Sequence, residues 1–321
     1  MSDLYIGIDG GGTKTAFVVI DENGKILAKE NSSTIHIRQQ SKENIKKIIF
    51  ETIDNMLESI GKKRSDINYL FAGVPGSGDL PEVPSVFDPI FDELVGKDKY
   101  TYKNDAVAGW AGSQAAKPGV NMVLGTGAIA FGMDYKGNEA RSSGWGSYCG
   151  DQGSGYWLGR EAIMLFGREA DYRAKRSYLY DLIRQKYKLN DDIDFITIIH
   201  DLNDDRTEIA KLSVLLTEAA KMGDDEAVKI FNRAAIEVVE SIRAVIKQLD
   251  FEDEEKIYIS YSGGVFNVGE LITKPIEDEL LKDSRIEKID SILNPTSGAA
   301  LMALKYAGVE ITDKIVENLK G

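Results

Sequence analysis

The sequence has few of the residues that form covalent cross-links or bind transition metals. Among 321 residues it contains one cysteine, Cys149, and two histidines, His36 and His200. A single thiol excludes an intrachain disulfide and an all-cysteine metal site, and it predicts a reducing, cytoplasmic setting. No second candidate ligand is spaced near His36, so we interpret it as a hydrogen-bonding loop residue. Cys149 is interpreted as a small packing residue, since no histidine lies near it in sequence.

Basic charge and long apolar runs are also scarce. The chain has 39 Lys and Arg against 52 Asp and Glu, which gives a formal net charge of -13. We therefore expect neither nucleic acid nor an anionic membrane as a partner, because both select for basic surfaces. No apolar run approaches the roughly 20 residues that span a bilayer. Asp3 and Asp9 interrupt the first apolar stretch, so no signal peptide is expected.

The pattern of the chain alternates strands with helices. Its length exceeds what one compact core usually holds, so two domains are expected. Period-two and helical spacings predict the elements of the first part of the chain. These are strands in 4–20 and 25–30, helix 42–61, strand 67–73, helix 84–96, strand 99–105 and helix 106–116. Farther on, we expect helices at 159–187, 193–202, 207–221, 224–248 and 295–308, and strands beginning at 256 and 285.

A repeat relates the opening segment to a later one. Residues 119–141 match the opening hairpin at a constant offset of 113 residues, for example between Asp21 and Asp134. The other matching pairs are Gly12 with Gly125, Thr13 with Thr126 and Gly24 with Gly137. Internal repetition of this kind indicates two related lobes. We expect an N-terminal lobe, 1–107, and a C-terminal lobe, 108–321, with a last helix near 296–306 that packs back on the N-terminal lobe.

Three glycine turns follow predicted strands, in the segments DGGGTKT (9–15), LGTGA (124–128) and SGGVF (262–266). One such turn alone is weak evidence, because most glycine pairs in hairpins serve only the geometry of the turn. Three together predict a phosphate site, because exposed backbone N–H groups form an anion-binding concavity. The hydroxyls of Thr13, Thr15 and Thr126 add donors, Lys14 is a candidate cation, and Asp9 is placed to hold Mg²⁺ through water. The spacing of a Walker A loop does not occur in the sequence.

The order of these motifs resembles a known family. IGIDGGGTKT, the pair Asn104-Asp105, LGTGA, GWGSYCGDQGSGYWLGREA (144–162) and SGGVF are similar to the N-acetylglucosamine kinases. These belong to the BadF/BadG/BcrA/BcrD-type ATPases of the sugar kinase/Hsp70/actin superfamily. The resemblance covers residues 4 to about 305, and segment 144–162 is its most specific part. It implies an α/β, duplicated actin-like (ribonuclease H-like) fold of two lobes with an interlobe cleft.

The resemblance also implies a role for each matching residue. ATP would be bound by Gly11, Gly12, Thr13, Lys14, Thr126, Gly127, Ala210, Gly263 and Gly264, with Mg²⁺ near Asp9. The sugar would be bound by Asn104, Asp105, Gly144, Trp145, Gly146, Tyr148 and Asp151. Asp105 would be the catalytic base, a role that suits a carboxylate at a strand end. Simpler roles remain open: Asp105 as a helix N-cap, Asp151 as a turn residue, and the two aromatic residues in packing.

The implied activity is transfer of the γ-phosphoryl group of MgATP to the 6-hydroxyl of N-acetylglucosamine, N-acetylmuramic acid or both. Mammalian members have Asn at the position of Ile35, and that Asn touches the sugar, so an apolar residue there is expected to reshape the pocket. The resemblance also favours a homodimer.

Three other functions stay open: an activator ATPase for a dehydratase or reductase, a sugar-sensing module and a hydrolase of phosphate chains. One cysteine per chain argues against the activator, which holds an iron–sulfur cluster between two subunits.

Overall fold

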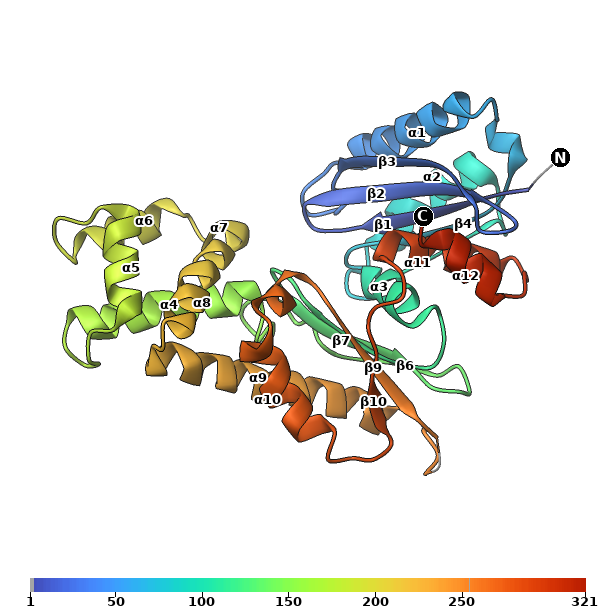
Figure 1. The fold of residues 1–321 in the computed structure, drawn as a ribbon. Helices are drawn as coiled ribbons and strands as arrows, with labels where there is room; N and C mark the ends of the chain where they lie inside the picture. The colour runs from blue at the N-terminus through green and yellow to red at the C-terminus, as the bar shows by residue number, and fades with distance from the viewer. Residues whose placement is uncertain (1–2, 254) are drawn as a thin grey trace. The chain divides into compact units, whose positions relative to one another are not determined.

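The computed structural model describes residues 3–253 and 255–321. They form two compact units (Figure 1). Unit 1 takes in the described residues up to Asn121 together with Asp290–Gly321, and unit 2 is Met122–Ile289. The boundary expected after residue 107 falls inside helix α3 (Asp105–Gln114), whereas the chain changes unit at Asn121 and again at Ile289. Helix α11 (Pro295–Tyr306), near the C-terminus, belongs to unit 1.

Unit 1 is built on a five-stranded sheet with the order β3-β2-β1-β4-β5. Its strands are β1 (Leu4–Gly10), β2 (Lys14–Asp21), β3 (Ile26–Ser33), β4 (Ile67–Gly73) and β5 (Tyr100–Lys103). The first three strands form an antiparallel meander, and β4 and β5 run parallel to β1. A parallel strand needs a crossover, which α1 (Lys42–Ser59) and α2 (Val83–Val95) supply.

Helices cover both faces of this sheet (Figure 1). On one face Leu4, Ile6 and Ile8 alternate along β1 and pack into a core with residues of α1 and α2. On the other face, Gly7 lies against α11, and a Cβ at Gly7 would stand 2.3 Å from Ala300 N. Only a glycine permits so close a contact between strand and helix. The last helix, α12 (Asp313–Leu319), also lies in unit 1.

Unit 2 repeats this plan. Its sheet has the order β10-β9-β6-β7-β8. Read from β8 to β10, this is the order of the first sheet, with β6, β7, β8, β9 and β10 in the places of β1, β2, β3, β4 and β5. The strands are β6 (Gly119–Leu124), β7 (Ala128–Met133), β8 (Glu139–Ser143), β9 (Ile257–Ser262) and β10 (Ile286–Lys288). Two sheets of one topology in one chain confirm the duplicated α/β fold.

The repeat extends to single hydrogen bonds in the second turn of each meander. Asp21 Oδ1 accepts hydrogen bonds from the N–H groups of Asn23 and Lys25, each at 2.9 Å. Asp134 Oδ1 accepts from Lys136 and Asn138, 113 residues later, also at 2.9 Å. An Asp that holds its own turn in this way explains why an Asp and a glycine recur at one offset.

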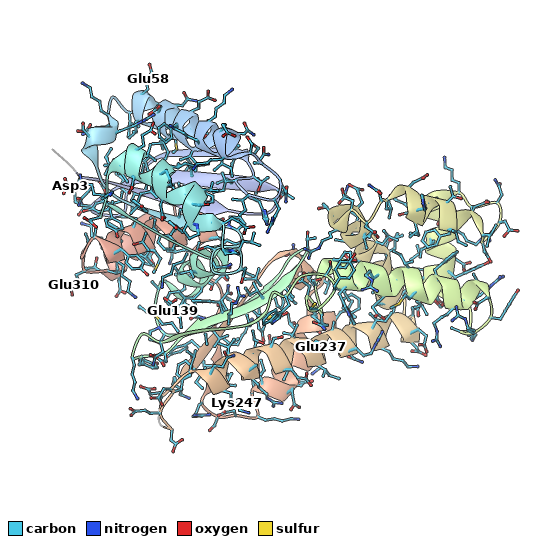
Figure 2. The ribbon with its side chains drawn as sticks, turned by 180° about the vertical axis from the view of Figure 1, so that it is seen from behind. Asp3, Glu58, Glu139, Glu237, Lys247 and Glu310 are labelled. Atoms are coloured by element: carbon cyan, nitrogen blue, oxygen red, sulfur yellow. The ribbon has the colours of Figure 1, made fainter. Side chains whose placement is uncertain are left out.

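Most helices of unit 2 lie between β8 and β9 in sequence, and α4 to α8 are grouped at one end of its sheet (Figure 1). They are α4 (Gly155–Ala170), α5 (Tyr178–Tyr187), α6 (Asp194–Asp201), α7 (Arg206–Lys211), α8 (Ser213–Lys221), α9 (Asp225–Gln248) and α10 (Glu270–Leu280). Helix α9 packs on β7 and β8, and α10 packs on α9. Exposed charged residues such as Lys247 on α9 and Glu58 on α1 project outward (Figure 2).

Two predicted helices of unit 2 are each divided in the structure. The helix expected at 159–187 ends at Ala170, Tyr172 has a φ of 62°, and the Ser177 hydroxyl accepts from Leu179 N–H to begin α5. The helix expected at 207–221 is broken between α7 and α8 at Leu212.

Among the helices of residues 3–253 and 255–321, none combines the length and the apolar character that a membrane span needs.

Candidate functional site

The first glycine turn leaves its backbone open. Gly11 N–H donates to Lys14 O at 2.8 Å, which closes the turn between β1 and β2. The Thr34 hydroxyl donates to Gly11 O at 2.8 Å and holds the turn from the end of β3. Gly12, Thr13 and Lys14 are exposed, as an anion-binding turn requires. Thr15 is completely buried, so its hydroxyl is not one of the exposed donors that we expected.

Two carboxylates lie where β1 ends and α3 begins. Asp9 pairs with Gly73 of β4, and a Cβ at Gly73 would stand 3.1 Å from Asp105 Cα. The missing side chain of Gly73 therefore lets the start of α3 approach the end of the parallel strands. Asp105 is the first residue of α3 and Asn104 is its N-cap, so the N-cap role considered for Asp105 falls to its neighbour.

The electrostatics of this pair favour proton transfer near neutral pH. Burial and, after it, the charge of Asp9 raise the pKa of Asp105 to about 7, although hydrogen bonds from the backbone at the helix N-terminus lower it. Burial also raises the pKa of Asp9 to about 6, while Lys14 opposes the rise. A carboxyl group with a pKa near the working pH has the strength needed of a general base.

Asn104 connects this helix to the loop that follows β4. Its Oδ1 accepts from Ala106 N–H at 3.1 Å, and its Nδ2 donates to Ser77 O at 3.1 Å and to Asp79 Oδ2 at 3.3 Å. The charge of Asp79 is a further cause of the raised pKa of Asp105. The sequence pattern indicated the loop 75–84 as a border of the pocket but not Asp79 itself, which lies 26 positions before Asp105.

Ile35 is part of the core of unit 1, where it is completely buried. A Cβ at Gly10 would stand 3.1 Å from Ile35 Cδ1, so this side chain supports the first glycine turn from the core side. His36 acts within its loop, where its Nδ1 accepts from Arg38 N–H at 3.0 Å and burial lowers its pKa.

Unit 2 contains a cavity of about 540 Å³ beside its glycine turns. This volume is within the range of small-molecule sites. The second turn supplies Gly125 and Thr126 to its wall, α7 supplies Ala210, and the third turn supplies Gly264 and Val265. Val214 and Leu158 add apolar surface, and Thr217 and Asn267 add polar groups. Apolar walls with a few polar groups suit a planar, mainly apolar ring such as a nucleobase.

The second and third glycine turns touch each other. Gly263 has a φ of 99°, and a Cβ there would stand 2.3 Å from Leu124 O, so the position requires glycine. Tyr261 before the third turn and Phe266 at its end stack with their ring centroids 4.6 Å apart. Thr126, Gly263 and Gly264, which came from separate motifs, thus lie in one neighbourhood within unit 2.

Segment 144–151 has an exposed part and a buried part. Trp145 and Tyr148 are 72% and 95% exposed, and Gly144 and Gly146, on either side of Trp145, have positive φ angles. Asp151 is only 4% exposed, accepts from Ala128 N–H at 3.2 Å and forms an ion pair with Arg206. Arg206 was missed in the sequence, since nothing local relates it to a partner 55 residues away.

The fold places this chain in a known structural class. It superposes on a crystal structure from Chromobacterium violaceum with a TM-score of 0.73, over 94% of this chain and 99% of that one. The two sequences are 21% identical, so this likeness concerns the fold. Together with the two sheets of one topology, it confirms the duplicated actin-like fold that the resemblance implied.

The chain belongs to the BadF/BadG/BcrA/BcrD ATPase family, whose profile matches residues 6–303. It is 29% identical over 313 residues to N-acetyl-D-glucosamine kinase of Dictyostelium discoideum, which covers 94% of this chain and 98% of that one. It is 31% identical over 262 residues to N-acetylmuramic acid/N-acetylglucosamine kinase of Clostridium acetobutylicum, over 82% and 85% of the two chains.

Proposed function

We propose that this protein is an ATP-dependent amino-sugar kinase that transfers the γ-phosphoryl group of MgATP to the 6-hydroxyl of N-acetylglucosamine, N-acetylmuramic acid or both. One observation carries the proposal: Asp105 begins a helix at the end of parallel strands, with a pKa of about 7 set by burial and by Asp9. Such a carboxylate can take the proton of an attacking hydroxyl. The named activities of the two curated relatives support the choice of amino sugars.

The cavity of unit 2 is the proposed site of the nucleotide. Ala210, Val214 and Val265 offer apolar surface for the base. The backbone at Thr126 and Gly127, with Gly263 and Gly264, would hold phosphates, and the exposed turn from Gly11 to Lys14 would supply further donors. Phosphoryl transfer depends mainly on positioning and on neutralising charge, and backbone N–H groups with Lys14 serve both needs.

Asp9 is the proposed residue for Mg²⁺, and its surroundings fit that ion. Its carboxylate is a hard oxygen donor beside an open turn, which leaves room for the waters that Mg²⁺ usually keeps. Burial raises the pKa of Asp9 to about 6, so a nearby cation would favour its ionised form. The ion would supply charge neutralisation to the phosphates.

The sugar is assigned to Asp105 and to segment 144–151. Positive φ angles at Gly144 and Gly146 present the faces of Trp145 and Tyr148 to solvent, where a pyranose ring can stack. Two of the lone-pair sites of Asp151 accept from Ala128 N–H and Arg206, which leaves acceptor capacity for a sugar hydroxyl. Asn104 would place Asp105 toward that hydroxyl by fixing the start of α3. A homodimer in the cytoplasm is part of this proposal.

A coupled assay for ADP release tests the proposal across five sugars: N-acetylglucosamine, N-acetylmuramic acid, glucosamine, N-acetylmannosamine and glucose. We expect sugar-dependent ADP release with at least one N-acetylated sugar, together with a 6-phosphorylated product identified by mass spectrometry and NMR. ATP hydrolysis that none of the five sugars stimulates would reject the kinase proposal. Phosphorylation of glucose alone would keep a kinase but reject an amino-sugar kinase.

A further inference from the structure

Asp151 connects three segments that are distant in sequence. Its Oδ1 accepts from Ala128 N–H at 3.2 Å, at the start of β7. Its Oδ2 pairs with Arg206, the first residue of α7. A Cβ at Gly127 would stand 3.1 Å from Asp151 Oδ2, so the glycine lets the carboxylate lie directly on the second turn. Asp151 itself has a φ of 62°, which turns its chain toward this contact.

The charge of Asp151 needs Arg206. The side chain of Asp151 is 5% exposed, and that of Arg206 is 42% exposed. A buried carboxylate that loses its cation either takes up a proton or moves toward water. Either change weakens the hydrogen bond from Ala128 N–H, because a charged acceptor binds an N–H more strongly than a neutral one. The strength of the hydrogen bond that holds the second turn therefore depends on Arg206 of α7.

The beginning of α4 also holds the second turn by hydrogen bonds. Gly155 N–H donates to Gly125 O at 2.8 Å, and Tyr156 N–H donates to Thr126 O at 3.3 Å. The guanidinium of Arg206 lies over the ring of Tyr156, 5.5 Å from its centroid. Arg206 thus contacts both Tyr156, whose N–H donates to the turn, and Asp151, whose carboxylate accepts from it.

The same arginine adjoins the wall of the cavity. Thr207 follows it in α7, and Thr207, Ala210 and Lys211 all line the cavity, as does Thr126 of the second turn. A shift at the start of α7 would move the part of the wall that α7 forms relative to the part that the second turn forms. Ligand binding is sensitive to such shifts, because binding groups must stay close to their productive positions.

We propose that Arg206 is a positioning residue for nucleotide binding: through its ion pair with Asp151 it fixes the second glycine turn against α7. This inference rests on the proposed function only in that the cavity of unit 2 is taken to bind a nucleotide. Its effect is on nucleotide affinity, and it requires no contact between Arg206 and the nucleotide.

Isothermal titration of the full chain with MgADP tests the proposal without any sugar. Replacing Arg206 with Met should raise the dissociation constant about tenfold, and Arg206→Lys, which keeps the charge, should raise it roughly threefold. The matched control is Arg173→Met, which removes an arginine from an exposed pair with Asp171 in the same unit. MgADP affinity should be unchanged in this control.

A double-mutant cycle distinguishes action through Asp151 from a general loss of structure. Asp151→Asn should weaken MgADP binding as Arg206→Met does, and the double variant should be little worse than either one. Fully additive effects would overturn the proposal, and so would MgADP affinity within twofold of wild type in a folded Arg206→Met chain. If Arg206→Met lacks a cooperative thermal transition, Arg206→Gln, which also removes the charge, decides, and unchanged affinity in that variant rejects the role.

The two proposals can fail separately. A wild-type chain that binds MgADP but phosphorylates none of the five sugars would reject the kinase proposal and leave the titrations of Arg206 variants valid. Equal MgADP binding by wild type and a folded Arg206→Met variant would reject only the role of Arg206. A wild-type chain that does not bind MgADP would reject both.

Discussion

The charge of Asp9 raises the pKa of Asp105, second only to burial as the cause of its value of about 7. Asp9 is the last residue but one of β1 and Asp105 is the first of α3, and Gly73 of β4 allows the close approach. The result is a carboxyl group that is partly protonated at neutral pH in the chain without ligands. This relationship leads to a prediction about pH.

The activity of the proposed kinase should depend on the protonation of Asp105. Because the base must be ionised, kcat/KM for the sugar should rise with pH through about 7. Asp79→Asn removes a negative charge that raises this pKa, so the rise should move to lower pH. The Asn side chain can still accept the hydrogen bond from Asn104 Nδ2. A pH–rate profile that is the same in wild type and variant would show that Asp79 does not influence the base.

Glu169 should make stability fall with increasing pH. It is completely buried, and burial raises its pKa from 4.5 to about 7, with the charge of Asp224 adding to the rise. The native state therefore holds a proton between about pH 4.5 and 7 that the unfolded state has released, so the free energy of unfolding declines as pH rises through this window. The full shift corresponds to a loss of roughly 3 kcal/mol above pH 7.

Glu169→Gln should remove this pH dependence, because the amide does not ionise. Urea unfolding at several values between pH 5 and 8 measures it, with Glu58→Gln on the exposed surface of α1 as the control. The variant should gain stability relative to wild type as pH increases, and the control should follow wild type. An equal pH slope in Glu169→Gln and wild type would show that Glu169 titrates normally in the folded chain.

The contact between α3 and α11 should tolerate no side chain at Gly298. A Cβ there would stand 2.2 Å from Gly112 N and 2.4 Å from Ala108 O, both of which are backbone atoms of α3. Gly298→Ala should therefore lower the free energy of unfolding of unit 1 by about 2 kcal/mol or more, because an added methyl group would clash with the backbone of α3.

Gly167→Ala is the matched control for this contact. Gly167 lies within α4, and nothing stands within 4 Å of a Cβ built there. Alanine should stabilise this helix by about 0.5–1 kcal/mol, because it loses less backbone entropy on folding than glycine does. Thermal and urea unfolding of both variants measures the pair. Equal stability of Gly298→Ala and wild type would mean that the two helices separate easily.

Local patterns predicted much of the fold. The glycine turns, the repeat at an offset of 113 residues and the meander of each sheet depend on near neighbours in sequence, and Asp21 and Asp134 hold their turns by the same hydrogen bonds. The break between α4 and α5 was not predicted, because residues 171–176 carry charged groups that also suit a helix surface. Its cause is the φ of 62° at Tyr172 and the cap at Ser177.

The site was predicted in part, for a related reason. The motifs indicated Asp9, Asp105 and the three turns, each from residues adjacent in sequence. The burial of Ile35 in the core could not be predicted, because a sequence position does not show whether a side chain faces a pocket or the core. Arg206 and Asp79 were missed because their importance arises from contacts with Asp151 and Asn104, which folding brings near them.

The most direct test of the account is Asp105→Asn, measured as sugar-dependent ADP release beside MgADP affinity. The substitution keeps the size of the side chain and removes its ability to accept a proton. We predict that kcat falls by about 10²–10⁴-fold, the usual contribution of a general base, while MgADP affinity stays within about threefold. Turnover close to that of wild type would contradict the assignment of Asp105 as the base and, with it, the central claim.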